Sequence, residues 1–399
     1  VPGWPPADQA HTADLVRIML VCPALFAVST LATSALNGLD RFLLAAAAPL
    51  MYNLALCAGA IFLRPLGAEG LAISAVAGAL LHLLVQLPGL ARVGMRYTAT
   101  LGLDLSGTRE VARLMGPRVL GLGVYQINQL VTIALASFLG QGSVAYLSYA
   151  WLVLMVPLGI IAMSISTATF PSLAREAAAG NLDQARQTFQ FGFRVICALN
   201  LAAAALLLVL ARPAVGLLLE RGEFGPDAAT ATAFALMWYV LGLPGHGAIE
   251  IVSRAFYAMR DTATPVRVAA GAVALNIVLS LILMRTSLGF GGLALANAAA
   301  ALTEATTLSI LLQRRLGWIE PGAFLPFLGR AALAAVALAA AALLVMAPLS
   351  TRMDIDHWTG QATSLASALV VGGLVYVLAN RALGVLEPAR AVALLLRRA

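Results

Sequence analysis

The stretch Val195–Ala211, with the sequence VICALNLAAAALLLVLA, decides the class of fold because it contains no charged residue. It lies within a longer apolar run, 190–218, that is long enough for an α-helix to cross a bilayer core about 30 Å thick. The whole chain has the same character: 61% of its residues are hydrophobic, 11% are charged, and its mean hydropathy is +0.91. A soluble domain has about a quarter charged residues. The sequence therefore predicts an all-α, polytopic membrane protein.

Apolar runs of similar length recur along the chain and predict about eleven transmembrane helices. They lie at 13–35, 43–64, 69–92, 117–139, 144–170, 190–218, 229–257, 264–286, 288–312, 326–348 and 362–384. About three-quarters of the arginines fall in alternate loops and in the C-terminal tail, and positively charged loops stay in the cytoplasm. We therefore expect a cytoplasmic C-terminus and an N-terminus on the other side.

Several functional classes are disfavoured by the motifs that the sequence lacks. The three cysteines form no CxxC pair, so neither a disulfide framework nor a metal site is indicated. HExxH, GxSxG and a phosphate-binding P-loop are also missing, which argues against a hydrolytic enzyme. The net charge of +7 is spread over the loops between spans, unlike a nucleic-acid footprint. We expect a transporter without cofactor, metal or catalytic residues, and leave its coupling ion open.

Two stretches recur at a common offset of about 220 residues, which indicates an internal repeat. Residues 35–41 correspond to 255–261, and residues 67–72 correspond to 289–294. The alternative is chance agreement of small residues in an alanine-rich and leucine-rich chain. Three predicted spans precede the second copy of the repeat and none precedes the first. We therefore expect the chain to be N-terminally truncated, with three further helices giving about 14 spans in the whole protein.

Polar side chains inside the predicted spans are the candidate functional residues, because they are costly in a membrane. Glu250 and Arg254 have the spacing of a favourable ion pair, which is either functional or purely structural. The repeat places Glu304 at the depth of His82, which suits a central substrate cavity with Gln126, Asn128 and Asn297 as further lining. Accidental hydrogen bonds between helices are the alternative. The substrate-cavity candidates are therefore His82, Arg118, Gln126, Asn128, Glu250, Arg254 and Glu304.

Basic residues near the membrane surface suggest two more roles. Arg118 begins a span after Pro117, where it either extends to the cytoplasmic headgroups or meets an anionic headgroup at the cavity mouth. The links at 94–116 and Ser172–Phe189 have helical character, so we expect amphipathic segments at the membrane surface rather than plain solvated connectors.

Several motifs resemble one family of bacterial transporters. The segments 121–128, 136–144 and 220–224 resemble the MurJ (MviN) lipid II flippases, and so do Pro157–Gly159 and Pro171–Leu173. The most specific stretch is Ser253–Ala258 followed by Asp261 and Pro265; we take Arg260, Asp261 and Pro265 as a cytoplasmic motif. The resemblance covers about residues 12–315 in order and places the chain in the multidrug/oligosaccharidyl-lipid/polysaccharide exporter superfamily.

The resemblance implies a multi-pass flippase of the bacterial inner membrane that moves lipid II outward by alternating access, for peptidoglycan and cell-wall biogenesis and cell shape. The family has two six-helix lobes and two extra helices that form a lipid-tail groove. The implied parts are the second half of the N-terminal lobe at 1–93, a link at 94–116, the C-terminal lobe at 117–315, and the extra helices with the tail at 316–399. Implied partners are a lipid-linked anionic substrate, membrane lipids and, as candidates, cell-wall synthesis proteins.

The chain also departs from the family pattern, so it resembles a divergent member. The stretch Tyr149–Leu152 lacks the two charges of a family motif, and Glu250 stands where the family often has lysine. A pyrophosphate needs cationic partners. Two alternatives therefore stay open: another polysaccharide-lipid or drug exporter of the superfamily, and a transport-inactive scaffold for envelope synthesis.

Overall fold

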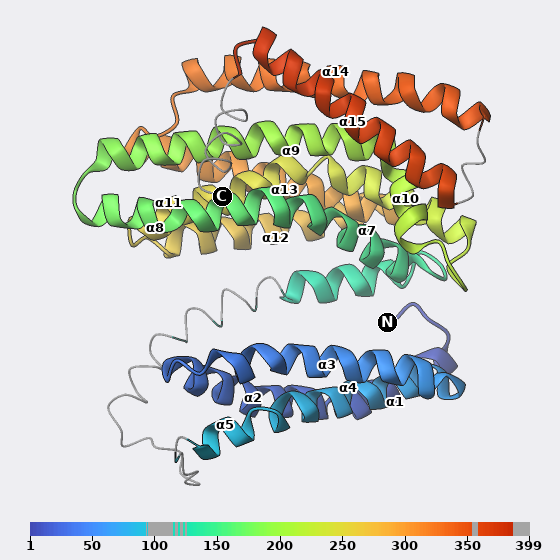
Figure 1. The fold of residues 1–399 in the computed structure, drawn as a ribbon. Coiled ribbons are helices and arrows are strands. Elements are labelled where there is room, and N and C mark those ends of the chain that lie inside the picture. The colour runs from blue at the N-terminus through green and yellow to red at the C-terminus, as the bar shows by residue number, and fades with distance from the viewer. Residues whose placement is uncertain are drawn as a thin grey trace. The chain divides into compact units, whose positions relative to one another are not determined.

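The computed structural model describes residues 1–92, 126–352 and 358–385, together with Gly94, Met115, Val119 and Gly123. Over these residues all the regular elements are helical. The chain divides into two compact units, Val1–Met115 and Gly116–Ala399 (Figure 1). Within the described ranges nine helices are long and apolar enough to span a membrane, or ten if one bent pair counts as a single span. This confirms an all-helical, polytopic membrane protein.

Two of the predicted spans each contain two helices. The run at 13–35 holds α1 (Pro6–Met19) and α2 (Val21–Gly38), which together form one apolar stretch, Pro6–Gly38, that is long enough to cross a membrane. Pro23 lies in the first turn of α2 and cannot donate a backbone hydrogen bond there. The run at 229–257 bends by 48° between α10 (Pro226–Val240) and α11 (Leu243–Ala258).

The predicted surface segment Ser172–Phe189 is also different from expectation. It forms the end of α8 (Ser164–Ala178) and the start of α9 (Leu182–Leu219), joined by a turn in which Gly180 has a positive φ. The two helices therefore continue through this segment instead of leaving a separate amphipathic element. The other predicted link, 94–116, and the start of the predicted span 117–139 lie outside the described residues, and this span is described as Gln126–Ala136.

The first unit is a small helical assembly around α4 (Gly67–Leu84). α4 packs against α1, α2 and α3 (Phe42–Phe62), and Ala75 and Ala79 are buried at these contacts. Two short helices, η1 (Arg64–Leu66) and α5 (Leu87–Arg92), flank α4. An open apolar groove of about 580 Å³ runs along α1, α3 and α4. Within the described residues of the first unit, no further helix covers this face.

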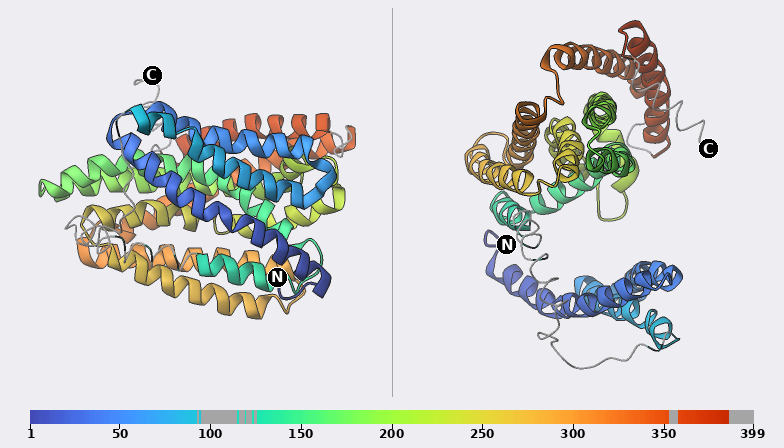
Figure 2. Two further views of the ribbon diagram at one scale, coloured as in Figure 1. Left: turned by 90° about the horizontal axis from the view of Figure 1, so that it is seen from below. Right: turned by 90° about the vertical axis from the view of Figure 1, so that its left-hand side faces the viewer.

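The second unit is built around α9, which contacts α8, α10, α11, α14 and α15. Its remaining helices are α7 (Ser143–Pro157), α12 (Ala263–Leu283), α13 (Phe290–Leu316), α14 (Pro321–Arg352) and α15 (Trp358–Ala382). A π-helical turn, Leu158–Met163, joins α7 to α8 directly after Pro157. α14 and α15 pair with each other and pack along α9 (Figures 1 and 2).

The predicted repeat appears in the backbone at the end of α2 and the end of α11. Asp40 and Arg260 are the two non-glycine residues with positive φ in the described chain, at 56° and 61°. Both terminate their helix by the same pair of hydrogen bonds, a Schellman motif. Arg41 N donates to Leu36 O at 2.8 Å, and Asp261 N donates to Phe256 O at 2.9 Å.

The second part of the repeat is equally well matched. Gly67 has φ 56° and ψ −129°, and Gly289 has φ 52° and ψ −123°, a conformation that is open essentially to glycine alone. A Cβ added to Gly70 would lie 2.5 Å from Leu63 O, and one added to Gly292 would lie 2.6 Å from Leu283 O. The helices α2, α3 and α4 are therefore a structural repeat of α11, α12 and α13.

Candidate functional site

Six polar residues lie along the contact between α11 and α13, and we call them the α11–α13 polar face: His246, Glu250, Arg254, Tyr257, Asn297 and Glu304. The first four recur on α11 at intervals of three or four residues, which places them on one side of that helix. The other two lie on the neighbouring helix α13, seven residues apart. The face thus gathers four of the residues predicted to line the cavity, Glu250, Arg254, Asn297 and Glu304, in one unit.

Glu250 and Arg254 form the ion pair that their spacing predicts. Arg254 Nη1 donates to Glu250 Oε2 at 2.5 Å and to the Glu250 carbonyl oxygen at 2.7 Å. Its Nη2 donates to Thr167 Oγ1 on α8 at 3.3 Å. The side chains keep 21% and 28% of their exposure, so the pair is only partly desolvated. Arg254 therefore connects α11 to α8 and is electrically neutralised by its own helix.

His246 is a member of this face that the sequence prediction missed. Its Nε2 lies 3.1 Å from Asn297 Oδ1 on α13, a hydrogen-bond distance. The ring of Trp151 on α7 meets His246 edge-on, with centroids 5.4 Å apart. Trp151 belongs to the stretch that lacks the charges of the family motif, so an aromatic contact occupies that position here. The position of His246 four residues before Glu250 was the available signal.

Glu304 is half-buried on α13, and within the described ranges no hydrogen bond or ion pair is seen for its carboxyl group. Glu304 lies on α13, whereas Glu250, Arg254 and Tyr257 lie on α11, and these two helices pack against each other. Burying a carboxylate without a partner is costly. Glu304 is therefore the member of the face whose charge is least well compensated.

His82 lies in the first unit and is part of a closed hydrogen-bond network. Its Nδ1 is 2.6 Å from Ser29 Oγ on α2, and Gln86 Nε2 donates to Ser29 Oγ at 2.8 Å. Thr33 Oγ1 donates to Gln86 Oε1 at 2.8 Å. His82 thus joins α2 to α4 by a hydrogen bond between helices. This is the alternative to a cavity role that the sequence left open. The counterpart of His82 by the repeat, Glu304, has no such network.

The remaining cavity candidates belong to the segment around residue 126. Gln126 is exposed, while Asn128 is buried and its Oδ1 accepts no hydrogen bond within the described structure. Arg118 lies outside the described residues. The cavity role of these residues stays a prediction.

The predicted cytoplasmic motif forms a compact cluster at the start of α12. The Thr264 amide donates to Asp261 Oδ1 at 3.0 Å and its hydroxyl to Asp261 Oδ2 at 2.7 Å. Arg315 at the end of α13 donates to the same Oδ2 at 2.6 Å. The Thr264 hydroxyl, then the Thr264 amide and Arg315, hold the pKa of Asp261 below its ordinary value. Pro265 is buried in the first turn of α12, and Arg260 is exposed.

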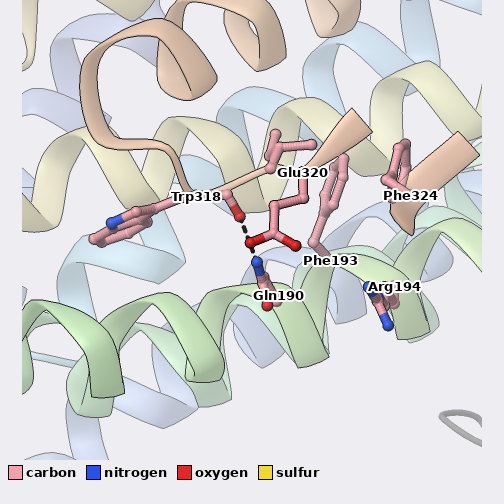
Figure 3. A pocket seen from close by; sticks show the side chains of 7 residues that line it. Gln190, Phe193, Arg194, Trp318, Glu320 and Phe324 are labelled. Atoms are coloured by element: carbon pink, nitrogen blue, oxygen red, sulfur yellow. Dashed lines mark hydrogen bonds between the residues drawn. The ribbon is translucent and has the colours of Figure 1, made fainter. Parts of the chain in front are cut away.

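A junction between α9 and the segment before α14 was not predicted from the sequence (Figure 3). Gln190 Nε2 donates to Trp318 O at 2.9 Å, and Arg186 forms an ion pair with Glu320. The rings of Phe193 and Phe324 stack here, with centroids 4.9 Å apart. The hollow between these residues, of about 10 Å³, has room for a single water molecule. The junction therefore anchors α14 to α9 and is not a ligand pocket.

Comparison with known proteins gives consistent matches. The family model described as "Lipid II flippase MurJ" matches residues 1–354. A probable lipid II flippase MurJ of Vibrio cholerae is 33% identical over 304 residues, which is 75% of this chain and 58% of that protein. A probable lipid II flippase MurJ of Rhizobium meliloti is 31% identical over 363 residues, covering 87% and 68%. The chain thus spans about three-fifths of the length of the first curated relatives.

Solved structures show the same fold. A lipid II flippase MurJ in an inward closed conformation matches with a TM-score of 0.79 and 21% identity, over 95% of this chain and 76% of that chain. A MATE transporter of Vibrio cholerae matches with a TM-score of 0.51 and 18% identity, over 80% and 72%.

Proposed function

The chain belongs to the lipid II flippase MurJ family, and from this premise we propose that its protein moves lipid II outward across the bacterial inner membrane. Transport by alternating access, with a cytoplasmic C-terminus, fits the arginine distribution and the repeated helical units. The observation that carries the proposal is the family match over residues 1–354. By the same premise, 326–348 and 362–384 are the lipid-tail groove helices, and the structure has α14 and α15 paired there.

The cationic groups that would hold the pyrophosphate are a specific question for this chain. Arg254 is already neutralised by Glu250, which lowers its value as a partner for a phosphate group. Arg118 is then the first candidate. Replacing Arg118 with Ala in the full-length protein should slow lipid II flipping in proteoliposomes, with Arg221→Ala as a control on the opposite side of the membrane. An unchanged rate would remove Arg118 from the substrate site.

Two alternatives make different predictions for cells depleted of the full-length protein. A flippase for lipid II leaves this precursor accumulated on the cytoplasmic side. An exporter of another polysaccharide-lipid or of drugs changes surface polysaccharide or drug sensitivity instead; the structural match to a MATE transporter favours keeping this alternative. A transport-inactive scaffold produces a shape defect without precursor accumulation. This alternative is kept because Trp151, in the stretch that lacks the charges of the family motif, contacts His246.

A further inference from the structure

The α11–α13 polar face contains more negative than positive groups. Glu250 and Glu304 are its two carboxyl groups, and Arg254 is its one guanidinium group. Arg254 is held by Glu250 through both the side chain and the backbone carbonyl. In the part of the chain that the structure describes, Glu304 is therefore left without a cation of its own.

Among the described residues, the other helices that pack on α13 do not supply the missing charge. α12 has Arg267 as its single ionisable residue, and this side chain is exposed and donates to Ala263 O at the start of the helix. α10 offers Asp227 and Tyr239, and α7 offers Tyr146 and Tyr149. On α13 itself, Arg315 pairs with Asp261 and Arg314 is exposed. A carboxylate that is half-buried within a membrane span without an ion-pair partner is disfavoured, which favours a proton or a bound cation on Glu304.

The surroundings of Glu304 favour the proton over a metal cation. Hard cations such as Ca²⁺ take six or more oxygen ligands. In the described ranges no group of three or more acidic, histidine or cysteine residues is placed to hold a metal ion.

We propose that Glu304 is a proton-binding site and that this proton is the ion coupled to transport, a role that rests on the proposed flippase function. When the proton leaves to solvent, two carboxylates compete for Arg254, which also holds Thr167 on α8. α8 begins directly after the π-helical turn 158–163, and such turns occur often at functional sites. The change of partner at Arg254 would therefore move α8 relative to α11 and α13.

The proton site is tested without transport, by infrared difference spectra of the full-length protein in detergent across a pH titration. We expect a C=O stretching band of a protonated carboxyl group at neutral pH that Glu304→Gln removes and Glu304→Asp shifts. The matched control, Glu223→Gln in an exposed turn, leaves the band unchanged. A band that survives Glu304→Gln overturns the proposal, and so does loss of the band on adding sodium at constant pH, which would indicate a metal cation instead.

A second variant tests the competition for Arg254. Arg254→Gln removes the partner of Glu250, so a second protonated band should appear, and the double variant Arg254→Gln with Glu250→Gln should lose it. Absence of the second band contradicts the competition.

Coupling is tested separately, in proteoliposomes with lipid II and an imposed pH gradient. The gradient should change the flipping rate of the wild-type protein several-fold, and Glu304→Gln should abolish this response. Flipping with the same gradient response in Glu304→Gln refutes the coupling. No flipping by a wild-type protein that still shows the carboxyl band refutes the proposed flippase function and leaves the proton site intact.

Discussion

The helices α2–α4 and α11–α13 have the same backbone and differ in what covers them. Leu71 and Leu293 occupy matched positions on α4 and α13, yet Leu71 is 49% exposed and Leu293 is 1% exposed. In the second copy, α7 and α10 pack on α13, and Phe234 of α10 contacts Phe290. In the first copy the corresponding side is the open groove along α1, α3 and α4. The repeated three-helix unit thus becomes a closed core only where further helices flank it.

The two copies differ in polar content as well. The first copy closes its polar residues into one network through Ser29, His82 and Gln86. The second copy holds an ion pair and the uncompensated Glu304. A satisfied network fixes the arrangement of helices, whereas an uncompensated ionisable group can respond to protons or charge. The comparison therefore assigns a mainly structural role to the first copy and the responsive role to the second.

The largest expected difference concerns Cys57, an exposed thiol that lines the groove of the first copy. A small maleimide should label Cys57 rapidly in detergent, because its thiol is exposed in the groove along α1, α3 and α4. Buried Cys22 and Cys197 serve as internal controls and should react far more slowly. Labelling of Cys57 as slow as that of Cys22 and Cys197 would break the comparison.

The next prediction tests whether the shared backbone conformation contributes equally to stability in both copies. Gly292→Ala and Gly70→Ala each place a Cβ against a backbone carbonyl oxygen, at 2.6 and 2.5 Å. Such overpacking costs about 1–3 kcal/mol, and the larger cost is expected at Gly292, where the surroundings are closed. The measurement is the midpoint of thermal unfolding in detergent. Gly271→Ala on α12, where a Cβ meets nothing within 4 Å, is the control and should be neutral. An equal decrease of the unfolding midpoint in Gly271→Ala would show that replacing any glycine in these helices is destabilising.

The third test addresses the ion pair, which the first copy lacks because Thr30 and Ser34 occupy the matched positions. Arg254→Gln leaves Glu250 unpaired and removes the link to Thr167. We expect a loss of about 1 kcal/mol, below the cost for a fully buried pair because both side chains are partly exposed. Ser34→Ala in the first copy should change the unfolding midpoint far less. A larger effect of Ser34→Ala would reverse the roles assigned to the two copies.

These comparisons also show which features were accessible from the sequence. Apolar runs and the repeat predicted the helices and the pairing of Glu250 with Arg254, because both depend on local spacing. The bend before α11 lies beside Pro244, a residue type that often marks bends in membrane helices. The continuation of α8 into the loop was missed, because a helix end depends on packing that a single sequence does not show. The contacts of His246 with Asn297 and Trp151 join residues far apart in the chain. No single-sequence pattern encodes such contacts.

The smallest expected effect distinguishes the starts of α3 and α12. Arg41 precedes α3 without a side-chain cap, whereas Asp261 accepts hydrogen bonds from Thr264 at the start of α12. Since the pKa of Asp261 is lowered by folding, its contribution to stability is present above the ordinary aspartate pKa and is lost as the pH falls through the lower, folded pKa. Asp261→Ala should cost about 1 kcal/mol at pH 7. Asp261→Asn, which retains an oxygen for the Thr264 amide, should cost less.

The same variants separate the cap from the ion pair with Arg315. If the cap dominates, Arg315→Gln lowers the unfolding midpoint less than Asp261→Ala does, and the difference between wild type and Asp261→Ala shrinks below pH 4. Arg41→Ala, at the matched uncapped start of α3, should show no dependence on acid over this range. A pH-independent difference for Asp261→Ala would mean that the charge of Asp261 contributes nothing, and that the two helix starts differ in hydrogen bonding alone.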